Sequence, residues 1–356
     1  MNLLSTMRPR RPAEMLTAAA ALLCFTLSPV LAVASSSSSS SGNTSHDVTR
    51  DAALAVGVEP PSSRNGPKWI RRAAWTLEKR LVQIMTWFDP CSPPDSKLSL
   101  RVLWWKAIAA TDQSSPVFEK DGVTYDMLPT GFRWLVRYPF HPRWVHSIIE
   151  IRTAYLDQAI ARIRSETKSS TKIRLISMGG GYDARSIRLQ LQGIIDEAVE
   201  LDLPKVIEAK RRLLGRLCKR RPDLNTSLPD FYPVDLTDID TVRKTLVDVL
   251  SGNGDGNRRY QPQWYNIFLF EGVLMYLPEG DPCKLLQACR QALNDAKGAK
   301  GCVVFADALE NIPNDDLRTA RMELPKYGWR VVEWLPKGGR TRHMGRADMK
   351  YLGLDQ

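Results

Sequence analysis

The stretch KIRLISMGGGYDARSIRLQLQGIIDEAVELD, residues 172–202, decides the fold. It reads as a short apolar strand over 173–178, three glycines, a helix that opens over 182–189, and a second strand that ends in Asp202. Glycines let the backbone turn sharply and approach a ligand, and the helix that follows them offers free N–H groups. This alternation predicts an α/β sheet with helices on both of its faces.

The next two predicted strands also end in acidic residues. The strands cover 231–234 and 265–270, and the acids at the three strand ends are Asp202, Asp235 and Glu271. Asp202 lies 21 positions after Gly181 and could accept both ribose hydroxyls of a nucleoside. Asp235 could accept an adenine amino group while Leu236 packs on the ring. Because an open α/β sheet binds ligands at the carboxyl ends of its strands, these residues mark a candidate site.

A dinucleotide fits this pattern poorly. Arg185 lies about where the dinucleotide turn needs its third glycine. Acids on three strand ends would also repel a diphosphate. The same acids suit a cofactor that carries hydroxyls, an amino group and a sulfonium charge, so the residues favour S-adenosyl-L-methionine.

Five motifs follow one another in a fixed order. They are Arg152-Thr153-Ala154-Tyr155-Leu156-Asp157, the glycine turn over 179–185, the segment 200–206, the pair Asp235-Leu236, and the segment 271–277. In these motifs the chain resembles the leucine carboxyl methyltransferase family from about 151 to 309, with a weaker echo at Gly328-Trp329. The resemblance implies a doubly wound, mostly parallel seven-stranded Rossmann-like methyltransferase sheet. An antiparallel C-terminal edge and an N-terminal helical cap would complete it.

The resemblance also implies a role for each residue that would bind the cofactor. Arg152 would hold the methionine carboxylate, for which a planar guanidinium is suited, and Glu271 would hold the methionine ammonium. The remaining contacts would be Gly179 and Gly181 with the methionine portion, Asp202 with the ribose, and Asp235 and Leu236 with the adenine.

The reaction implied by the resemblance is methyl transfer to an oxygen, usually that of a carboxylate. A carboxylate is already ionised at neutral pH, so this transfer needs no general base. Tyr276, just after the fourth strand, is the candidate catalytic residue because it could orient the acceptor. Arg133, Arg137 or Arg185 could anchor an acidic acceptor, and the sequence leaves that choice open.

Several functions stay open. The leading interpretation is methylation of a small acidic metabolite by a monomeric enzyme. The alternatives are methylation of the C-terminal leucine carboxylate of protein phosphatase 2A, and S-adenosylmethionine binding without catalysis. The net charge of +11 arises partly from basic runs at 64–106 and 205–221, which we interpret as solvated helix faces. No aromatic-and-basic motif indicates a nucleic-acid partner, and the four His and six Cys show no metal-ligand spacing.

The ends of the chain carry further expectations. Residues 1–34 combine early arginines, an apolar run and Ala32-Val33-Ala34, which is typical of a signal peptide; an uncleaved membrane anchor is the alternative. A Ser-rich linker over 35–66 would follow, as in proteins sent to an organelle such as a plastid by the secretory route. Without a working leader the protein would be cytoplasmic. A helical cap over 67–151, the methyltransferase domain over 152–356, and a C-terminal hairpin at Gly338-Gly339 whose last strand ends near Met344 complete the prediction.

Overall fold

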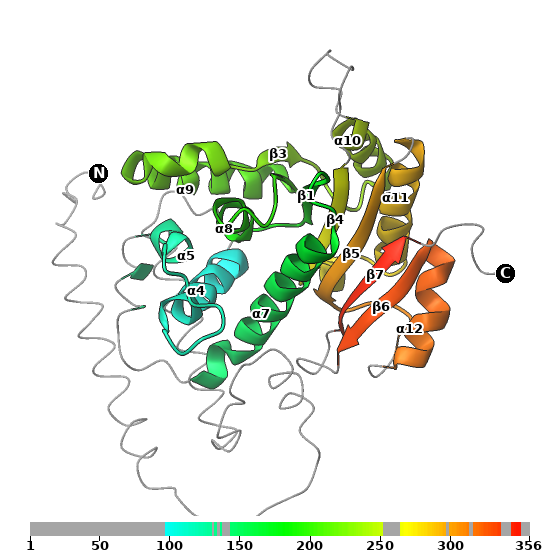
Figure 1. Ribbon diagram of the computed structural model, residues 1–356, viewed down its shortest axis with the longest axis horizontal. Coiled ribbons are helices and arrows are strands. Elements are labelled where there is room, and N and C mark those ends of the chain that lie inside the picture. Colours follow the sequence, from blue (N-terminus) through cyan, green and yellow to red (C-terminus); the bar gives the residue numbers. More distant parts are fainter. Residues whose placement is uncertain are drawn as a thin grey trace, which may run out of the picture. The chain divides into compact units, whose positions relative to one another are not determined.

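The computed structural model describes residues 97–129, 132–133, 136, 143–251, 264–296, 299–312, 316–335 and 343–349. Seven strands form one sheet in the order β3-β2-β1-β4-β5-β7-β6 (Figure 1). Their bounds are β1 Lys172–Met178, β2 Glu197–Asp202, β3 Asp230–Pro233, β4 Trp264–Glu271, β5 Lys300–Asp307, β6 Trp329–Leu335 and β7 His343–Met349.

The sheet is parallel from β3 to β5. At its centre, Ile176 of β1 is paired with Val199 of β2 on one side and with Phe268 of β4 on the other. β7 runs antiparallel to both of its neighbours, β5 and β6, with Arg346 opposite Val304. The predicted seven-stranded, mostly parallel sheet with an antiparallel C-terminal edge is therefore confirmed.

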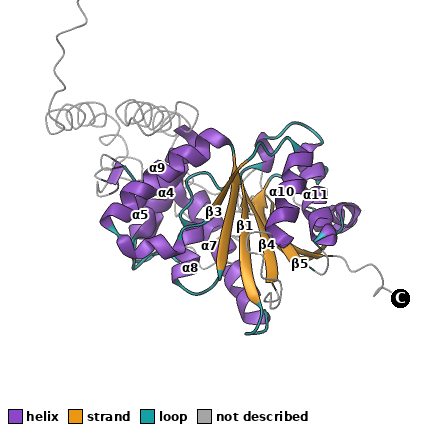
Figure 2. Ribbon diagram, turned by 90° about the horizontal axis from the view of Figure 1, so that it is seen from above, coloured by secondary structure: helices purple, strands orange, loops and turns teal. Residues whose placement is uncertain are grey.

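Helices cover both faces of the sheet. Their bounds are α4 Lys97–Thr111, α5 Val123–Met127, α7 Arg143–Glu166, α8 Arg185–Leu191, α9 Pro204–Arg220, α10 Ile239–Ser251, α11 Asp281–Asp295 and α12 Leu317–Glu323; the short 3-10 helices are η2 Pro222–Ser227, η3 Leu274–Tyr276 and η5 Leu324–Tyr327. Figure 2 shows α7 and α8 on one side of the strands and α10 and α11 on the other.

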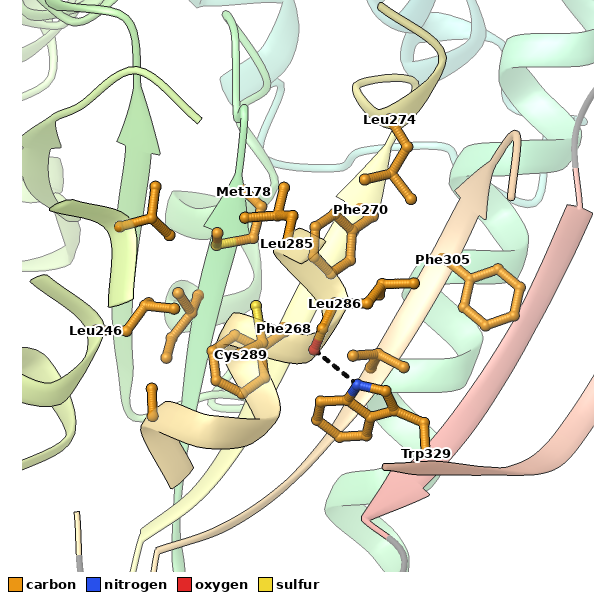
Figure 3. Close-up of a cluster of buried hydrophobic side chains, with 14 of the residues drawn as sticks. Met178, Leu246, Phe268, Phe270, Leu274, Leu285, Leu286, Cys289, Phe305 and Trp329 are labelled. Atoms are coloured by element: carbon orange, nitrogen blue, oxygen red, sulfur yellow. Dashed lines mark hydrogen bonds between the residues drawn. The ribbon is translucent and has the colours of Figure 1, made fainter. Parts of the chain in front are cut away.

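The strand side chains alternate between two cores because successive residues of a strand point to opposite faces. In β1, Ile176 and Met178 belong to the core under α10 and α11, whereas Ile173 and Leu175 belong to the core under α7. Figure 3 shows the first core, where the buried Trp329 donates its indole N–H to the carbonyl of Leu286 at 2.9 Å. Both faces of the central strands are thus buried, which accounts for their predominantly apolar sequence.

The structure corrects one expectation and qualifies another. The last strand does not end near Met344 but continues to Met349. Polar residues are accommodated there because Arg346 pairs with Asp348 at 2.9 Å and with Glu166 at 2.6 Å. The boundary expected between residues 151 and 152 falls inside α7, so no linker separates the cap from the sheet at that point.

Other expectations concern residues that the structure does not describe. The leader over 1–34, the linker over 35–66, the first part of the cap over 67–96 and the turn at Gly338-Gly339 all lie outside the described residues. Among the residues that are described, no helix is long and apolar enough to cross a membrane. The same residues hold no group of three or more His, Cys, Asp or Glu side chains that could bind a metal ion.

Candidate functional site

The glycine turn links β1 to α8 at the carboxyl edge of the sheet. Gly179 and Gly181 have φ values of 71° and 51°, a region that side chains other than glycine rarely adopt. A Cβ atom on Gly179 would lie 2.5 Å from Val273 Cγ2 and 3.6 Å from Leu236 Cδ1. The turn therefore lies directly against the segments that follow β3 and β4, and only a glycine fits there.

Asp202, at the end of β2, faces the same turn. The N–H of Gly181 donates to Asp202 Oδ2 at 2.7 Å, and the N–H of Leu203 donates to Oδ1 at 2.7 Å. Burial raises the pKa of Asp202, and these two N–H groups partly oppose the rise. Each carboxylate oxygen retains a lone pair that could accept a further hydrogen bond, such as one from a ribose hydroxyl.

A network of three buried cations and two partly buried acids lies next to the turn. Arg152 Nε on α7 donates to Glu271 Oε1 at 3.0 Å. Lys106 Nζ on α4 donates to Glu271 Oε2 at 2.8 Å and to Asp183 Oδ2 at 2.9 Å. Arg185 Nη1 on α8 donates to Asp183 Oδ2 and to Glu271 Oε2, both at 2.6 Å. Residues far apart in the chain thus meet at the carboxyl end of β4.

The network keeps both of its acids ionised. Burial works to raise the pKa of Glu271, but Arg185, Lys106 and Arg152 outweigh it, and the pKa lies well below its usual value. Asp183 follows the same pattern, because burial is outweighed by Arg185 and Lys106 and the pKa falls to about 2. The side chains of Asp183 and Glu271 are only 18% and 9% exposed, so water screens these interactions weakly.

Two donors of this network are available to bind an anion. Within the described part of the chain, Arg152 Nη1 and Arg185 Nη2 are buried and have no hydrogen-bond partner. A buried donor without an acceptor costs about 1–3 kcal/mol, and more when the donor is charged. The methionine carboxylate of S-adenosylmethionine is an acceptor that would satisfy Arg152 Nη1, so the residues present fit the cofactor.

The remaining predicted site residues differ in how far they are buried. Leu236 is 6% exposed. It lies near Gly179, because a Cβ atom on Gly179 would be 3.6 Å from Leu236 Cδ1. Asp235 is exposed, and its Oδ1 accepts hydrogen bonds from the N–H and Oγ1 of Thr237 at 3.0 and 2.8 Å. Tyr276 lies in η3 with 58% of its surface exposed. Its proposed part in orienting the acceptor stays a prediction.

The three arginines that the sequence suggests as anchors for the acceptor differ in what the structure shows of them. Arg185 is 1% exposed and also binds Asp157 at 2.7 Å, so it organises the charge network instead of presenting a surface. Burial and then the charge of Arg133 lower the pKa of Arg220, the last residue of α9, so Arg133 acts on the end of α9 that lies away from Asp202. Arg137 lies outside the described residues.

Sequence reasoning missed two members of the site. Lys106 is the one cation in the apolar run VLWWKAIAA over 102–110 of α4, and that isolated charge is the available signal. It belongs to the basic run 64–106 that was expected to be solvated, yet it is only 5% exposed. Asp183 lies in the predicted glycine turn over 179–185 without an assigned role, yet its carboxylate bridges Lys106 and Arg185. Lys210 departs from the expected solvated face of 205–221, because it is buried and donates to Glu200 Oε2 at 2.5 Å.

The fold and the site define a methyltransferase that uses S-adenosyl-L-methionine. The model of the leucine carboxyl methyltransferase family matches residues 102–289, just over half of the chain. The chain belongs to this family. The match begins within α4, well before the Arg152 motif, and therefore includes Lys106.

Solved structures of methyltransferases are similar at low identity. One is a magnesium protoporphyrin IX methyltransferase from Synechocystis PCC 6803 with bound S-adenosylmethionine, with 14% identity over 62% of this chain and 92% of that chain and a TM-score of 0.39. Another is an O-methyltransferase family protein from Burkholderia thailandensis, with 14% identity over 60% of this chain and 63% of that chain and a TM-score of 0.32. No curated protein matches the sequence significantly.

Proposed function

We propose that the protein transfers the methyl group of S-adenosylmethionine to a carboxylate oxygen of a small acidic metabolite. The observation that carries the proposal is the Arg152–Glu271 pair beside the glycine turn. The guanidinium of Arg152 has one nitrogen without a partner and could bind the carboxylate of an amino acid. The carboxylate of Glu271 beside it could bind the ammonium of the same amino acid. When bound, S-adenosylmethionine supplies an electrophilic methyl group.

The residues of the site divide the binding between the two ends of the cofactor. Arg152 Nη1 would hold the methionine carboxylate. Glu271 Oε1 accepts a hydrogen bond from Arg152 Nε and keeps a lone pair for the methionine ammonium. Asp202 would hold the ribose hydroxyls, and Asp235 and Leu236 would hold the adenine.

The acceptor would enter where the strand ends expose apolar surface. Leu203, Met275 and Tyr276 are 46%, 39% and 58% exposed. No base is needed for an acceptor that is already a carboxylate, so the chain's contribution is to align the oxygen with the methyl group and to exclude water. Tyr276 could orient the acceptor from η3.

The experiment uses the full chain, S-adenosylmethionine labelled in its methyl group, and a panel of carboxylic acids. Label that alkali releases as volatile methanol identifies a carboxyl methyl ester. We expect such label on a small acid. Label found only on a peptide that ends in the C-terminal leucine of protein phosphatase 2A would favour the protein substrate. Alkali-stable label would exclude carboxylate methylation, and binding without label on any acceptor would favour a non-catalytic protein.

Arg152→Lys tests the methionine end of the site. Lysine keeps the charge beside Glu271 but cannot also present the free guanidinium nitrogen. We expect affinity for S-adenosylhomocysteine to fall by about 10- to 100-fold, the equivalent of losing one hydrogen bond to a charged group. Calorimetric titration measures the affinity, and thermal unfolding without ligand should change little because Glu271 keeps a cation. Affinity equal to that of the unchanged protein would remove Arg152 from the cofactor site.

We also propose that residues 1–34 direct the chain into the secretory route towards an organelle. Support comes from the arginines that precede the apolar run and from Ala32-Val33-Ala34. A fluorescent reporter joined to residues 1–65 should enter the endoplasmic reticulum and become shorter after Ala34. A full-length reporter spread through the cytosol would contradict this proposal and favour a cytoplasmic enzyme.

A further inference from the structure

One buried acid takes no part in the site as proposed so far. Asp307, the last residue of β5, is 0% exposed. Its Oδ2 accepts the N–H groups of Val273 and Leu274 at 2.6 and 2.9 Å. Its Oδ1 accepts those of Met275 and Ala308 at 3.3 and 2.8 Å. A single carboxylate thus satisfies four backbone N–H groups, three of them from the connection that follows β4.

That connection is held from two directions. The side chain of Leu274 is 1% exposed and points into the core beneath α11, as Figure 3 shows. Its N–H donates to Asp307 Oδ2. The next two residues, Met275 and Tyr276, expose their side chains. The core and Asp307 together therefore fix the path of the backbone between Glu271 and Tyr276.

The same connection touches the glycine turn. Val273, whose N–H bonds to Asp307, fills the space where Gly179 would carry a side chain, because a Cβ there would lie 2.5 Å from Val273 Cγ2. A movement of Val273 towards β1 would press on the turn, and a movement away would open a gap beside it. Asp307 thus sets the spacing between the ends of β1 and β4 without lying at the site itself.

We infer that Asp307 is a positioning residue, whose carboxylate holds the 273–275 backbone so that Glu271 and Val273 form one wall of the methionine end of the cofactor site. This inference rests on the proposed function, in which Glu271 and Gly179 contact the methionine portion. The nucleoside end depends on Asp202, which Asp307 does not contact. Asp307 therefore controls binding of the amino-acid part of the cofactor and leaves binding of the nucleoside part unchanged.

Asp307→Asn tests the inference in the full chain. The amide keeps the shape of the side chain but turns one acceptor oxygen into a donor, which must then face backbone N–H groups. Two probes separate the two ends of the site: S-adenosylhomocysteine, which carries the amino acid, and 5′-methylthioadenosine, which lacks it. We expect affinity for the first to fall by about 10- to 100-fold. Affinity for the second should stay within about twofold, a difference within the reach of calorimetry.

Hydrogen exchange gives a second readout. The amides of 273–275 should exchange faster in Asp307→Asn, because their acceptor is weakened, while the rest of the sheet keeps its protection. The control is Asp196→Asn, which removes the negative charge that pairs with Arg164 (3.3 Å) and accepts the N–H of Ile173 (2.8 Å) at the opposite end of β1. That variant should lower thermal stability and leave the ratio of the two affinities unchanged.

The outcomes separate the two proposals. If the unchanged protein binds neither probe, the proposed function is wrong and the inference falls with it. If the unchanged protein binds both probes and Asp307→Asn weakens both equally, or weakens neither, the inference alone is overturned. Should Asp307→Asn fail to fold, Val273→Ala takes its place, because it removes the contact with Gly179 and keeps the bonds to Asp307. A ratio that stays unchanged in Val273→Ala overturns the inference as well.

Discussion

Arg185→Met is expected to lower the free energy of unfolding by about 3–5 kcal/mol, because it removes one partner of a buried charge network. Methionine fills much the same space, so the loss would come from charge and not from a cavity. Asp183 and Glu271 would lose the cation that lies 2.6 Å from each of them, and Asp157 would lose a partner at 2.7 Å. Chemical denaturation of the protein without ligand measures the change.

An exposed pair provides the control. Arg212 and Glu208 lie 2.8 Å apart on α9 with side chains 43% and 68% exposed, so Arg212→Met should change stability by no more than about 0.5 kcal/mol. Equal losses in the two variants would show that the buried network adds nothing to stability beyond what a surface pair adds.

The pH dependence of Arg185→Met has a definite sign. In the unchanged protein the pKa of Asp183 is lowered from 3.8 to about 2, so its ionised form favours the folded state. This stability is present above pH 3.8 and is lost as the pH falls from there to about 2. Without Arg185 the folded pKa values of Asp183 and Glu271 rise, and the midpoint of acid unfolding should move to higher pH. An unmoved midpoint by circular dichroism would contradict this account.

Gly179→Ala should damage both the fold and the site. The left-handed conformation costs alanine about 1–2 kcal/mol, and overpacking against Val273 adds about 1–3 kcal/mol. Because the turn must shift to relieve the 2.5 Å approach, we expect affinity for S-adenosylhomocysteine to fall at least about tenfold. Thermal unfolding and calorimetry measure the two effects.

Gly193→Ala is the matched control. Gly193 has a similar φ of 65°, but a Cβ atom there would meet nothing within 4 Å. Gly193→Ala should therefore lower the free energy of unfolding only by the cost of the left-handed backbone, about 1–2 kcal/mol, and leave cofactor affinity unchanged. If both variants lose the same stability and both keep their affinity, the contact between Gly179 and Val273 does not shape the site.

The sequence predicts the central sheet well because its strands are buried on both faces. Largely apolar runs such as 173–178 and 265–270 have few alternatives to a buried strand, and the glycine turn and a strand-end acid follow them directly. The extent of β7 is harder to predict, since polar and apolar residues do not alternate regularly in its sequence HMGRADM. Its Arg346 pairs with Glu166, which is distant in the chain. Pairing with both β5 and β6 therefore outweighed its weak local preference.

The site is predictable only where its residues lie in local motifs. Arg152, Glu271 and the glycine turn could be proposed as a site because each lies in a motif that carries the family resemblance, and their roles stay predictions. The part that Lys106 plays could not, because its partners lie 77 and 165 positions away and its isolated charge does not identify them. Asp307 could not either, because its partners are backbone N–H groups more than 30 positions earlier, and no residue type marks them.

The most direct test of the account is calorimetric titration of the full chain with S-adenosylmethionine and, separately, with NAD. The arrangement of Arg152, Glu271 and Asp202 at the carboxyl edge of the sheet predicts saturable one-to-one binding of S-adenosylmethionine. It also predicts no binding of NAD, because the acids at the strand ends repel a diphosphate. Binding of NAD, or the absence of heat with S-adenosylmethionine from a protein shown to be folded, would contradict the account.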